Sequence, residues 1–230
     1  MAKLKWDQTG ERKYETGVNQ CALYVYNTNT YDPGVAWNGI TSISESPDGA
    51  EANDLWADNQ KYATLRSAEN FGGTIEAYTH PSAFYPCDGV IKFAGMIFGQ
   101  QTRKKFGLVY TTRVGSDNTT TDDGEILHLV YGATASPSER SYETINDSPD
   151  AITFSWEFET TPEVVSDKYS AVTKATSILR IDTTRLNSTQ LTRYETLKNW
   201  VYGSDKHEPT LLLPDQVFAL MQDGTEPANG

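Results

Sequence analysis

Residues 146–158, NDSPDAITFSWEF, pass from a turn straight into the most regular strand pattern of the chain. The turn is predicted by Ser148, Pro149 and Asp150, because proline presets φ and short polar side chains bond to nearby backbone. After it, four large apolar residues alternate with polar ones: Ile152, Phe154, Trp156 and Phe158. A period of two places these side chains on one face of a sheet. We therefore expect a central β-strand whose apolar face is covered by other elements.

Short strand patterns separated by turn residues continue along most of the chain. The 230 residues, 37% of them hydrophobic, can bury a sizeable core. Glycine, asparagine, aspartate and serine are scattered rather than gathered in a linker, which favours one mainly β domain with a β-sandwich or β-barrel core. Strands are expected at residues 18–26 and 35–43, which form a first hairpin, and at 61–65, 74–78, 92–98, 106–114, 125–133, 177–182 and 211–213. The strands at 106–114 and 125–133 are expected to pair as a hairpin.

One flanking α-helix is predicted at about residues 188–202. Asn187 suits the N-cap, Gln190 stands in the capping-box position, and Gly203 suits the position after the last turn. Spacings of three and four place one apolar stripe on this helix: Leu191, Tyr194, Leu197 and Val201. The helix is therefore expected to cover an edge or face of the sheet.

The two ends of the chain are predicted to lie outside the β domain, which is assigned to residues 18–221. Residues 1–17 form an extended arm, and residues 222–230 form a flexible tail after a short terminal element at 216–221. Trp6 and Tyr14 are aromatic residues on an otherwise polar arm. They indicate docking onto a neighbouring molecule, with packing on the chain's own surface as the alternative.

A long loop is expected at residues 44–60, SESPDGAEANDLWADNQ. It holds Leu55 and Trp56 among acidic residues, followed by Asp58 and Asn59. A loop of this length that carries a tryptophan is typical of a functional flap or a protein interface. The alternative is that Trp56 folds back into the core of its own chain.

The net charge of −12 argues against a nucleic-acid reader, which needs a basic surface. Residues 1–115 carry 12 acids and 11 bases, whereas residues 116–230 carry 19 acids and 8 bases. The one local basic cluster, residues 100–105, is interpreted as a solvated turn or as a charge partner for acids on a neighbouring molecule. An acidic surface formed by the second half would repel polyanions, although solubility alone also explains the charge.

The sequence predicts a chain that is made in a cytoplasm and does not span a membrane. It has no apolar run of about 20 residues, and no apolar stretch follows the basic residues at its start. Cys21 and Cys87 lack CxxC spacing, so two reduced core thiols are expected rather than a disulfide.

Motifs for catalysis, cofactors or metals are missing from the sequence. Neither GxSxG nor GxxxxGK[ST] occurs, and the three histidines, His80, His128 and His207, lack metal-ligand spacing. His128 is interpreted as a core or rim residue with satisfied contacts. The acids of one predicted hairpin tip miss the EF-hand spacing and are interpreted as solvated: Asp117, Asp122 and Asp123. A carboxylate pair of the glycosidase type stays open, because acids on separate strands converge only in three dimensions.

Six segments, in order along the chain, carry a family resemblance: GERKYETGV (10–18), GVAWNGITSISESPDGAEAN (34–53), LWADNQKYATL (55–65), GQQTRKKFGLVYTTRVG (99–115), LHLVYG (127–132) and TINDSPDAITFSWEFETTP (144–162). In these segments the sequence resembles the major tail proteins of long-tailed bacteriophages of the siphovirus type, which polymerise into the tail tube. Residues 164–175 and those beyond Leu213 resemble the family less closely.

The resemblance implies a phage tail tube fold without catalytic activity or cofactor, located in the virion tail. Subunits would join into rings, expected to be hexameric, and the rings would stack into a conduit through which DNA reaches the host. The N-terminal arm and the long loop would make the stacking contacts, which gives Trp6, Tyr14, Leu55, Trp56, Asp58 and Asn59 a role as interface residues. Implied partners are the tape measure protein, the tail terminator and tail-tip proteins.

Two other functions fit the sequence less well. A monomeric carbohydrate- or receptor-binding β-sandwich module would use tryptophan and tyrosine as platforms for sugars. A glycosidase is supported only by the abundance of acids. Ring closure has an independent physical argument, because exposed sheet edges are sticky and edge-to-edge closure hides them.

Overall fold

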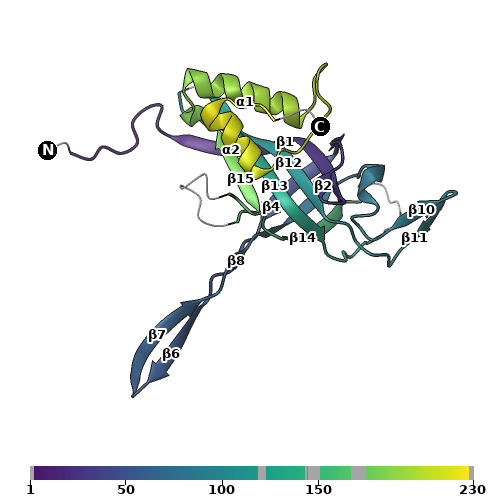
Figure 1. Ribbon diagram of the computed structural model, residues 1–230, viewed down its shortest axis with the longest axis horizontal. Helices are drawn as coiled ribbons and strands as arrows, with labels where there is room; N and C mark the ends of the chain where they lie inside the picture. The colour runs from purple at the N-terminus through teal and green to yellow at the C-terminus, as the bar shows by residue number, and fades with distance from the viewer. Residues whose placement is uncertain (1–2, 119–122, 143, 145–150, 167–174, 228–230) are drawn as a thin grey trace.

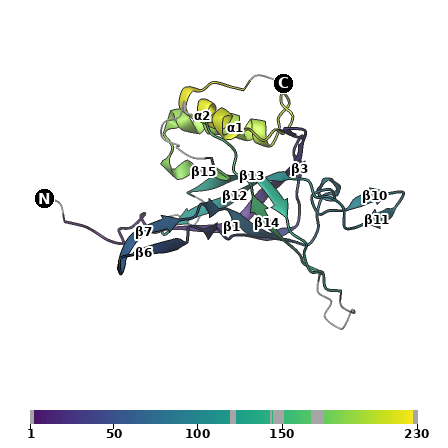
Figure 2. The same ribbon diagram turned by 60° about the horizontal axis from the view of Figure 1, so that its bottom comes forward.

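The computed structural model describes residues 3–118, 123–142, 144, 151–166 and 175–227. Within these ranges the protein is mainly β, with one large antiparallel sheet and two α-helices. Both helices lie on the same face of the sheet, and two hairpins project from the body (Figure 1). Figure 2 shows the helices as a separate layer over the strands.

The large sheet has the order β2-β1-β12-β13-β14-β9-β4, with β15 paired to β13 and β3 paired to β1. Its strands are β1 (Lys13–Asn27), β2 (Thr30–Tyr31), β3 (Val35–Ala36), β4 (Ile40–Glu45), β9 (Gly72–Ala77), β12 (Phe106–Ser116), β13 (Gly124–Ala135), β14 (Phe154–Thr160) and β15 (Ile178–Asp182). The sheet curls, so that β4 at one end contacts β1 near the other. The predicted hairpin over 106–133 and the predicted strand at 177–182 are confirmed as β12, β13 and β15.

The central strand is confirmed in part. In β14, Trp156 and Phe158 are buried in the core that the curled sheet encloses. The Trp156 ring lies 5.5 Å from that of Trp37 and 5.3 Å from that of Phe84. Ile152 was expected on the same apolar face, but it precedes the strand and is 41% exposed. The turn predicted at 148–150 lies outside the described residues.

The predicted first hairpin is wrong in its second strand. β1 is longer than expected and already pairs with β12 at Lys13, so only residues before it form an arm outside the sheet. The stretch 35–43 is divided between β3, which pairs with β1, and β4, which pairs with β9. The division falls where Trp37 turns into the core and donates from Nε1 to the Thr79 carbonyl at 2.9 Å. Gly39, with φ of +80°, then redirects the chain to β9.

The stretch 92–98 is a hairpin rather than a single strand. It consists of β10 (Ile91–Phe93) and β11 (Met96–Phe98), which pair with each other. Ala94 and Gly95 both have positive φ, at 49° and 81°, as the tight turn of a two-residue loop requires. Alanine seldom adopts this conformation, so residue types alone did not indicate the turn.

Helix α1 (Ser188–Val201) is confirmed, including its capping box between Asn187 and Gln190. Its buried residues are Tyr194, Leu197, Trp200 and Val201, whereas Leu191 is exposed and does not belong to the stripe. Two short 3₁₀ helices are η1 (Ser82–Phe84) and η2 (Thr183–Arg185).

A second helix, α2 (Pro214–Asp223), replaces the strand predicted at 211–213 and the short element after it. Pro214 occupies the first turn, where its missing N–H costs nothing, and Gly224 ends the helix with φ of 72°. The helix therefore extends into the predicted tail, whose residues 228–230 lie outside the described ones. The expectation of a single flanking helix is wrong.

A second core joins the helices to the outer face of the sheet. Leu127, Leu129 and Tyr131 of β13 face α1 and the residues that lead into α2. Tyr131 Oη donates to the Leu212 carbonyl at 2.9 Å, and Tyr24 Oη donates to the Val201 carbonyl. These bonds satisfy buried hydroxyl groups and fix the helix layer on the sheet. Within the described residues, neither helix is long and apolar enough to cross a lipid bilayer.

Candidate interaction surface

A long two-stranded arm leaves the body between β4 and β9 (Figure 1). This hairpin arm, residues 46–71, has a root in which β5 (Asp48–Gly49) pairs with β8 (Glu69–Asn70). Its outer part is the pairing of β6 (Ala52–Ala57) with β7 (Gln60–Arg66). The predicted loop at 44–60 is thus one half of a hairpin. Its strand character was hidden because almost every side chain in β6 and β7 is exposed, so no alternation between buried and solvated positions is present.

The outer part of the hairpin arm has a well-formed turn. Asp58 and Asn59 have φ values of 51° and 62° and separate the paired residues Ala57 and Gln60. Two consecutive positive φ values are typical of a type I′ turn, whose twist matches that of a β-hairpin. Asp and Asn tolerate positive φ values better than most residues. These two predicted interface residues therefore shape the tip.

A polar contact also joins the two strands of the arm. The Asp54 carboxylate lies 2.8 Å from Lys61 Nζ and accepts a hydrogen bond from Thr64 Oγ1 at 2.7 Å. Lys61 and Thr64 lower the pKa of Asp54, because both stabilise its charged form. The arm thus keeps a defined register although its side chains are solvated.

Four large apolar side chains remain exposed on the outer part of the arm. Trp56 is 69% exposed and Tyr62 78%, and Leu55 and Leu65 are exposed as well. We call these four residues the arm surface. An isolated two-stranded hairpin is only marginally stable in water, and several large exposed apolar groups on one element indicate a binding surface. The alternative that Trp56 packs into its own core is wrong.

Sequence reasoning found Leu55 and Trp56 but missed Tyr62 and Leu65. The latter two fall in a segment that was predicted as an ordinary strand of the sheet. The signal that could have found them is the nearby Asp58-Asn59 pair, which is typical of a two-residue hairpin turn and places β7 beside β6.

The N-terminal segment, residues 3–12, is a second exposed element (Figure 1). Trp6 is 73% exposed, and Gln8 Nε2 donates to its carbonyl at 3.2 Å. The segment is attached to the sheet where Gly10 N donates to Asp117 Oδ1 at 2.9 Å and Arg12 lies 3.8 Å from the same carboxylate. Asp117 therefore anchors the segment, whereas Asp122 lies outside the described residues.

Tyr14 differs from Trp6, because it belongs to β1 and its ring lies on the sheet, where it is still 56% exposed. It stands opposite Gly115 of β12, where a Cβ atom would lie only 2.6 Å from the Tyr14 ring. A glycine at this position lets the ring lie across the neighbouring strand. The structure thus places Leu55, Trp56, Asp58 and Asn59 together on the arm, Trp6 on the N-terminal segment and Tyr14 at the start of β1.

A polar cluster lies at the base of the hairpin arm, around the buried imidazole of His128. Its Nδ1 lies 3.5 Å from Glu45 Oε1, and its Nε2 lies 3.5 Å from Glu15 Oε1. Tyr110 stacks on the imidazole at 4.5 Å and donates from Oη to Glu45 at 2.8 Å, and Arg180 pairs with the other Glu45 oxygen. Burial lowers the pKa of His128, although the nearby Glu15 carboxylate raises it.

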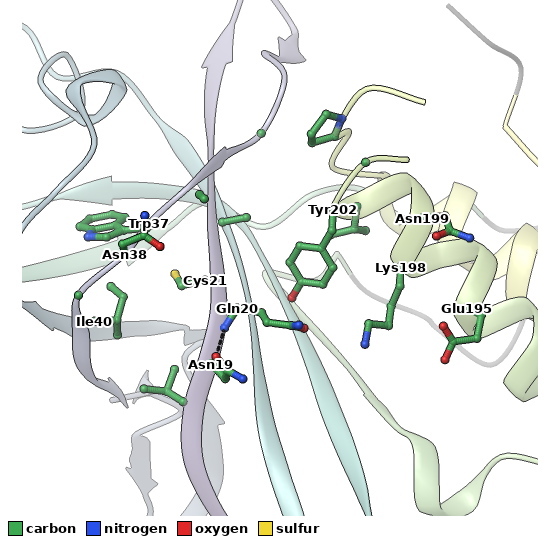
Figure 3. Close-up of a pocket in the computed structure, with 18 residues that line it drawn as sticks. Asn19, Gln20, Cys21, Trp37, Asn38, Ile40, Glu195, Lys198, Asn199 and Tyr202 are labelled. Carbon is green, nitrogen blue, oxygen red and sulfur yellow. Dashed lines mark hydrogen bonds between the residues drawn. The ribbon is translucent and has the colours of Figure 1, made fainter. Parts of the chain in front are cut away.

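A pocket of roughly 750 Å³ lies between β1 and the end of α1 (Figure 3). Asn19, Gln20 and Cys21 reach it from β1, and Lys198 and Tyr202 reach it from the helix side. The Cys21 thiol is unsuited to nucleophilic chemistry, because burial raises its pKa far above the usual range. Lys198 Nζ already donates to Glu125 at 2.6 Å.

Other sites for chemistry are equally scarce in the described part of the chain. No group of three or more His, Cys, Asp or Glu side chains there could hold a metal ion. Cys21 and Cys87 are both buried free thiols, as expected. The exposed apolar surfaces are therefore the stronger candidate site.

No protein-family model matches this sequence, and no curated protein matches it.

Proposed function

We propose that this protein is a structural subunit that assembles with copies of itself into stacked rings and forms the tail tube of a long-tailed bacteriophage. The observation that carries the proposal is the hairpin arm. It extends from a well-packed body and presents Trp56 and Tyr62 to solvent. Because the arm buries little of its own surface, a contact with another molecule is the simplest source of its stability.

The arrangement of the arm supports stacking between rings. It leaves the body as a single hairpin and ends in a tight turn at Asp58 and Asn59. An element of this shape can reach a subunit in a neighbouring ring without disturbing the sheet that holds it. The N-terminal segment with Trp6 is a second element of this kind, which becomes buried on assembly.

Sheet edges support lateral association. Among the described residues, β15 pairs only with β13, and β4 pairs only with β9, so each has one strand edge without a sheet partner. Such edges expose backbone donors and acceptors, and closure of copies into a ring covers them. We propose six subunits per ring on the family resemblance.

The charge of the chain fits a conduit for DNA. A net charge of −12 avoids the counterion-release attraction that a basic wall would create, so DNA could slide without being held. The proposed role needs no catalysis, cofactor or metal. The tape measure protein, the tail terminator and tail-tip proteins are the proposed partners in the virion.

Negative-stain electron microscopy of the purified chain tests this function. The wild-type protein should form rings or tubes at high concentration, or when a tape-measure or tail-tip nucleus is added. A variant in which a Gly-Ser turn replaces residues 50–68 keeps the root of the arm and should form rings that do not stack. A wild-type chain that stays monomeric even with the nucleus contradicts the proposal and favours the monomeric carbohydrate-binding module.

A further inference from the structure

The β10–β11 hairpin carries a second apolar surface, separate from the arm surface. Ile91 stands opposite Phe98, and Phe93 stands opposite Met96. Because side chains alternate along a strand, these four residues share one face of the hairpin. All four are exposed, Phe93 to 69%. On the opposite face Lys92 lies over the Tyr85 ring at 5.7 Å, and its partner Ile97 is 59% exposed. We call the four residues the hairpin face.

A concave apolar surface lies elsewhere on the same chain, between β15 and α2. This hollow has a volume of roughly 490 Å³. Its apolar lining comes from the sheet, the start of the helix layer and α2: Leu179, Ile181, Leu186, Val217, Phe218 and Met221. A convex and a concave apolar surface therefore occur on one molecule.

The two surfaces lie on opposite sides of the body. The β10–β11 hairpin projects away from β15 and α2 in both views (Figures 1 and 2). A hairpin face therefore cannot fill the hollow of its own chain, but it can fill that of a second copy. Such a contact joins different surfaces of the two copies, and repetition of it builds a closed ring or a helical array.

Charge favours the same pairing. Residues 89–105, which include the hairpin and the loop after it, carry four bases and no acid. Residues 208–227, which include α2, carry four acids and no base. The chain as a whole has a net charge of −12, so two copies repel each other unless oppositely charged segments meet. The charged residues that line the hollow itself are paired within the chain, Arg180 with Glu45 and Arg185 with Asp182. Arg103 likewise pairs with Asp88, whereas within the described residues Lys104 and Lys105 contact only neutral oxygens. The contact therefore sets these two lysines against the acids of α2, Asp215 and Asp223.

We infer that the hairpin face docks into the hollow between β15 and α2 of a second copy of this chain, and that this contact joins neighbouring subunits within a ring. The inference rests on the proposed self-assembly and adds the lateral contact to it. Phe93 and Met96 at the end of the hairpin insert, Lys104 and Lys105 of the following loop face the acids of α2, and the hollow loses its contact with water.

Sedimentation velocity with paired variants tests this contact. The full-length chain carries Trp56→Ala throughout, so that the arm does not contribute. Phe93→Asp destroys the hairpin face and keeps the hollow, whereas Met221→Asp destroys the hollow and keeps the hairpin face. Each variant alone should be monomeric, while the parent chain associates. An equimolar mixture should form a dimer and nothing larger, because only one intact pair of surfaces remains.

Two controls secure the interpretation. Val164→Asp changes another exposed apolar residue outside both surfaces and should associate like the parent. Thermal unfolding verifies that each variant is folded, and if Met221→Asp is not, Gln222→Arg at the exposed rim of the hollow replaces it.

The remaining outcomes overturn the inference in distinguishable ways. If Phe93→Asp associates as strongly as the parent, or the mixture stays monomeric, the lateral contact is wrong and ring assembly stands. If the wild-type chain fails to associate under every condition, ring assembly falls together with the contact. If the wild-type chain stays monomeric but floats with phosphatidylglycerol vesicles, and Phe93→Asp does not float, the hairpin face binds lipid instead.

Discussion

Nδ1 of His128 lies 3.5 Å from Oε1 of Glu45, the residue at which β4 ends and the hairpin arm begins. His128 belongs to β13 in the centre of the sheet, and its Nδ1 is buried without a hydrogen-bond partner among the described residues. One imidazole therefore lies in contact with the base of the arm. Glu15 on the other ring nitrogen couples it to the strand that follows the N-terminal segment.

The stability of the folded chain should fall as pH is lowered from about 7 to about 5. Burial lowers the pKa of His128 below its ordinary value of about 6.5, so the unfolded chain takes up a proton first. Neutral His128 contributes fully to stability at pH values above its pKa in the unfolded chain. This contribution is lost as pH falls toward the lower pKa that His128 has in the folded chain. Urea unfolding at several pH values measures this loss, and His128→Gln should remove it. An equal slope in that variant contradicts the assignment to His128.

Trp56→Ala should abolish the stacking of rings and leave the fold unchanged. The side chain is 69% exposed, so its removal should alter the free energy of unfolding by no more than about 0.5 kcal/mol. Trp156→Ala is the matched control, because Trp156 is fully buried and its loss should cost about 3–5 kcal/mol. Microscopy of tubes and thermal unfolding of the monomer separate the two effects. Unfolding of Trp56→Ala at a much lower temperature contradicts an interface role.

Sequence reasoning succeeded where local chemistry alone sets the structure. The capping residue Asn187 and the alternation that ends in Trp156 and Phe158 predicted α1 and β14, because caps and buried faces leave a local pattern. It failed where a segment has no buried face. The hairpin arm lacks alternation, and Ala94 in a left-handed turn concealed the β10–β11 hairpin.

Only part of the candidate site could be predicted from the sequence, because some of its residues lack a local pattern. Leu55 and Trp56 stood out as apolar residues among acids, whereas Tyr62 resembled any strand residue. The hollow between β15 and α2 depends on elements that meet only in the folded chain. Helix α2 itself was misread, because the short apolar run at Leu211 and Leu212 fits a buried strand as well as the approach to a helix.

Asn187→Ala should destabilise the monomer by about 1 kcal/mol. The Asn187 side chain accepts from Gln190 N at 2.9 Å, and the substitution removes this bond. The other bond of the capping box, from Asn187 N to Gln190 Oε1 at 3.0 Å, uses the backbone and is kept. Asn199→Ala serves as the control, because Asn199 is exposed within the same helix and alanine favours helix there. Chemical unfolding measures both variants. Equal stability of the two contradicts the importance of the cap.

Limited trypsin digestion of the free chain should shorten the N-terminal segment and cut the hairpin arm. Lys3 and Lys5 precede the sheet, and Lys61 and Arg66 lie on the exposed strand β7. These parts bury little surface in the free chain, so they open locally at low cost. Lys198, whose ammonium pairs with Glu125 against the sheet, should resist cleavage under the same conditions. Mass spectrometry of the fragments identifies each site.

Assembly should then protect the same bonds. In the proposed tubes the N-terminal segment and the arm are buried between rings, so cleavage at Lys5 and Lys61 should slow by at least about tenfold, because each site must open against its new contacts. Rings of Trp56→Ala provide the comparison, because they keep the lateral contact and lack the stacking contact. Protection at Lys61 in tubes but not in these rings would assign the arm to stacking. Equal cleavage in tubes and free chain would exclude the arm from the interface.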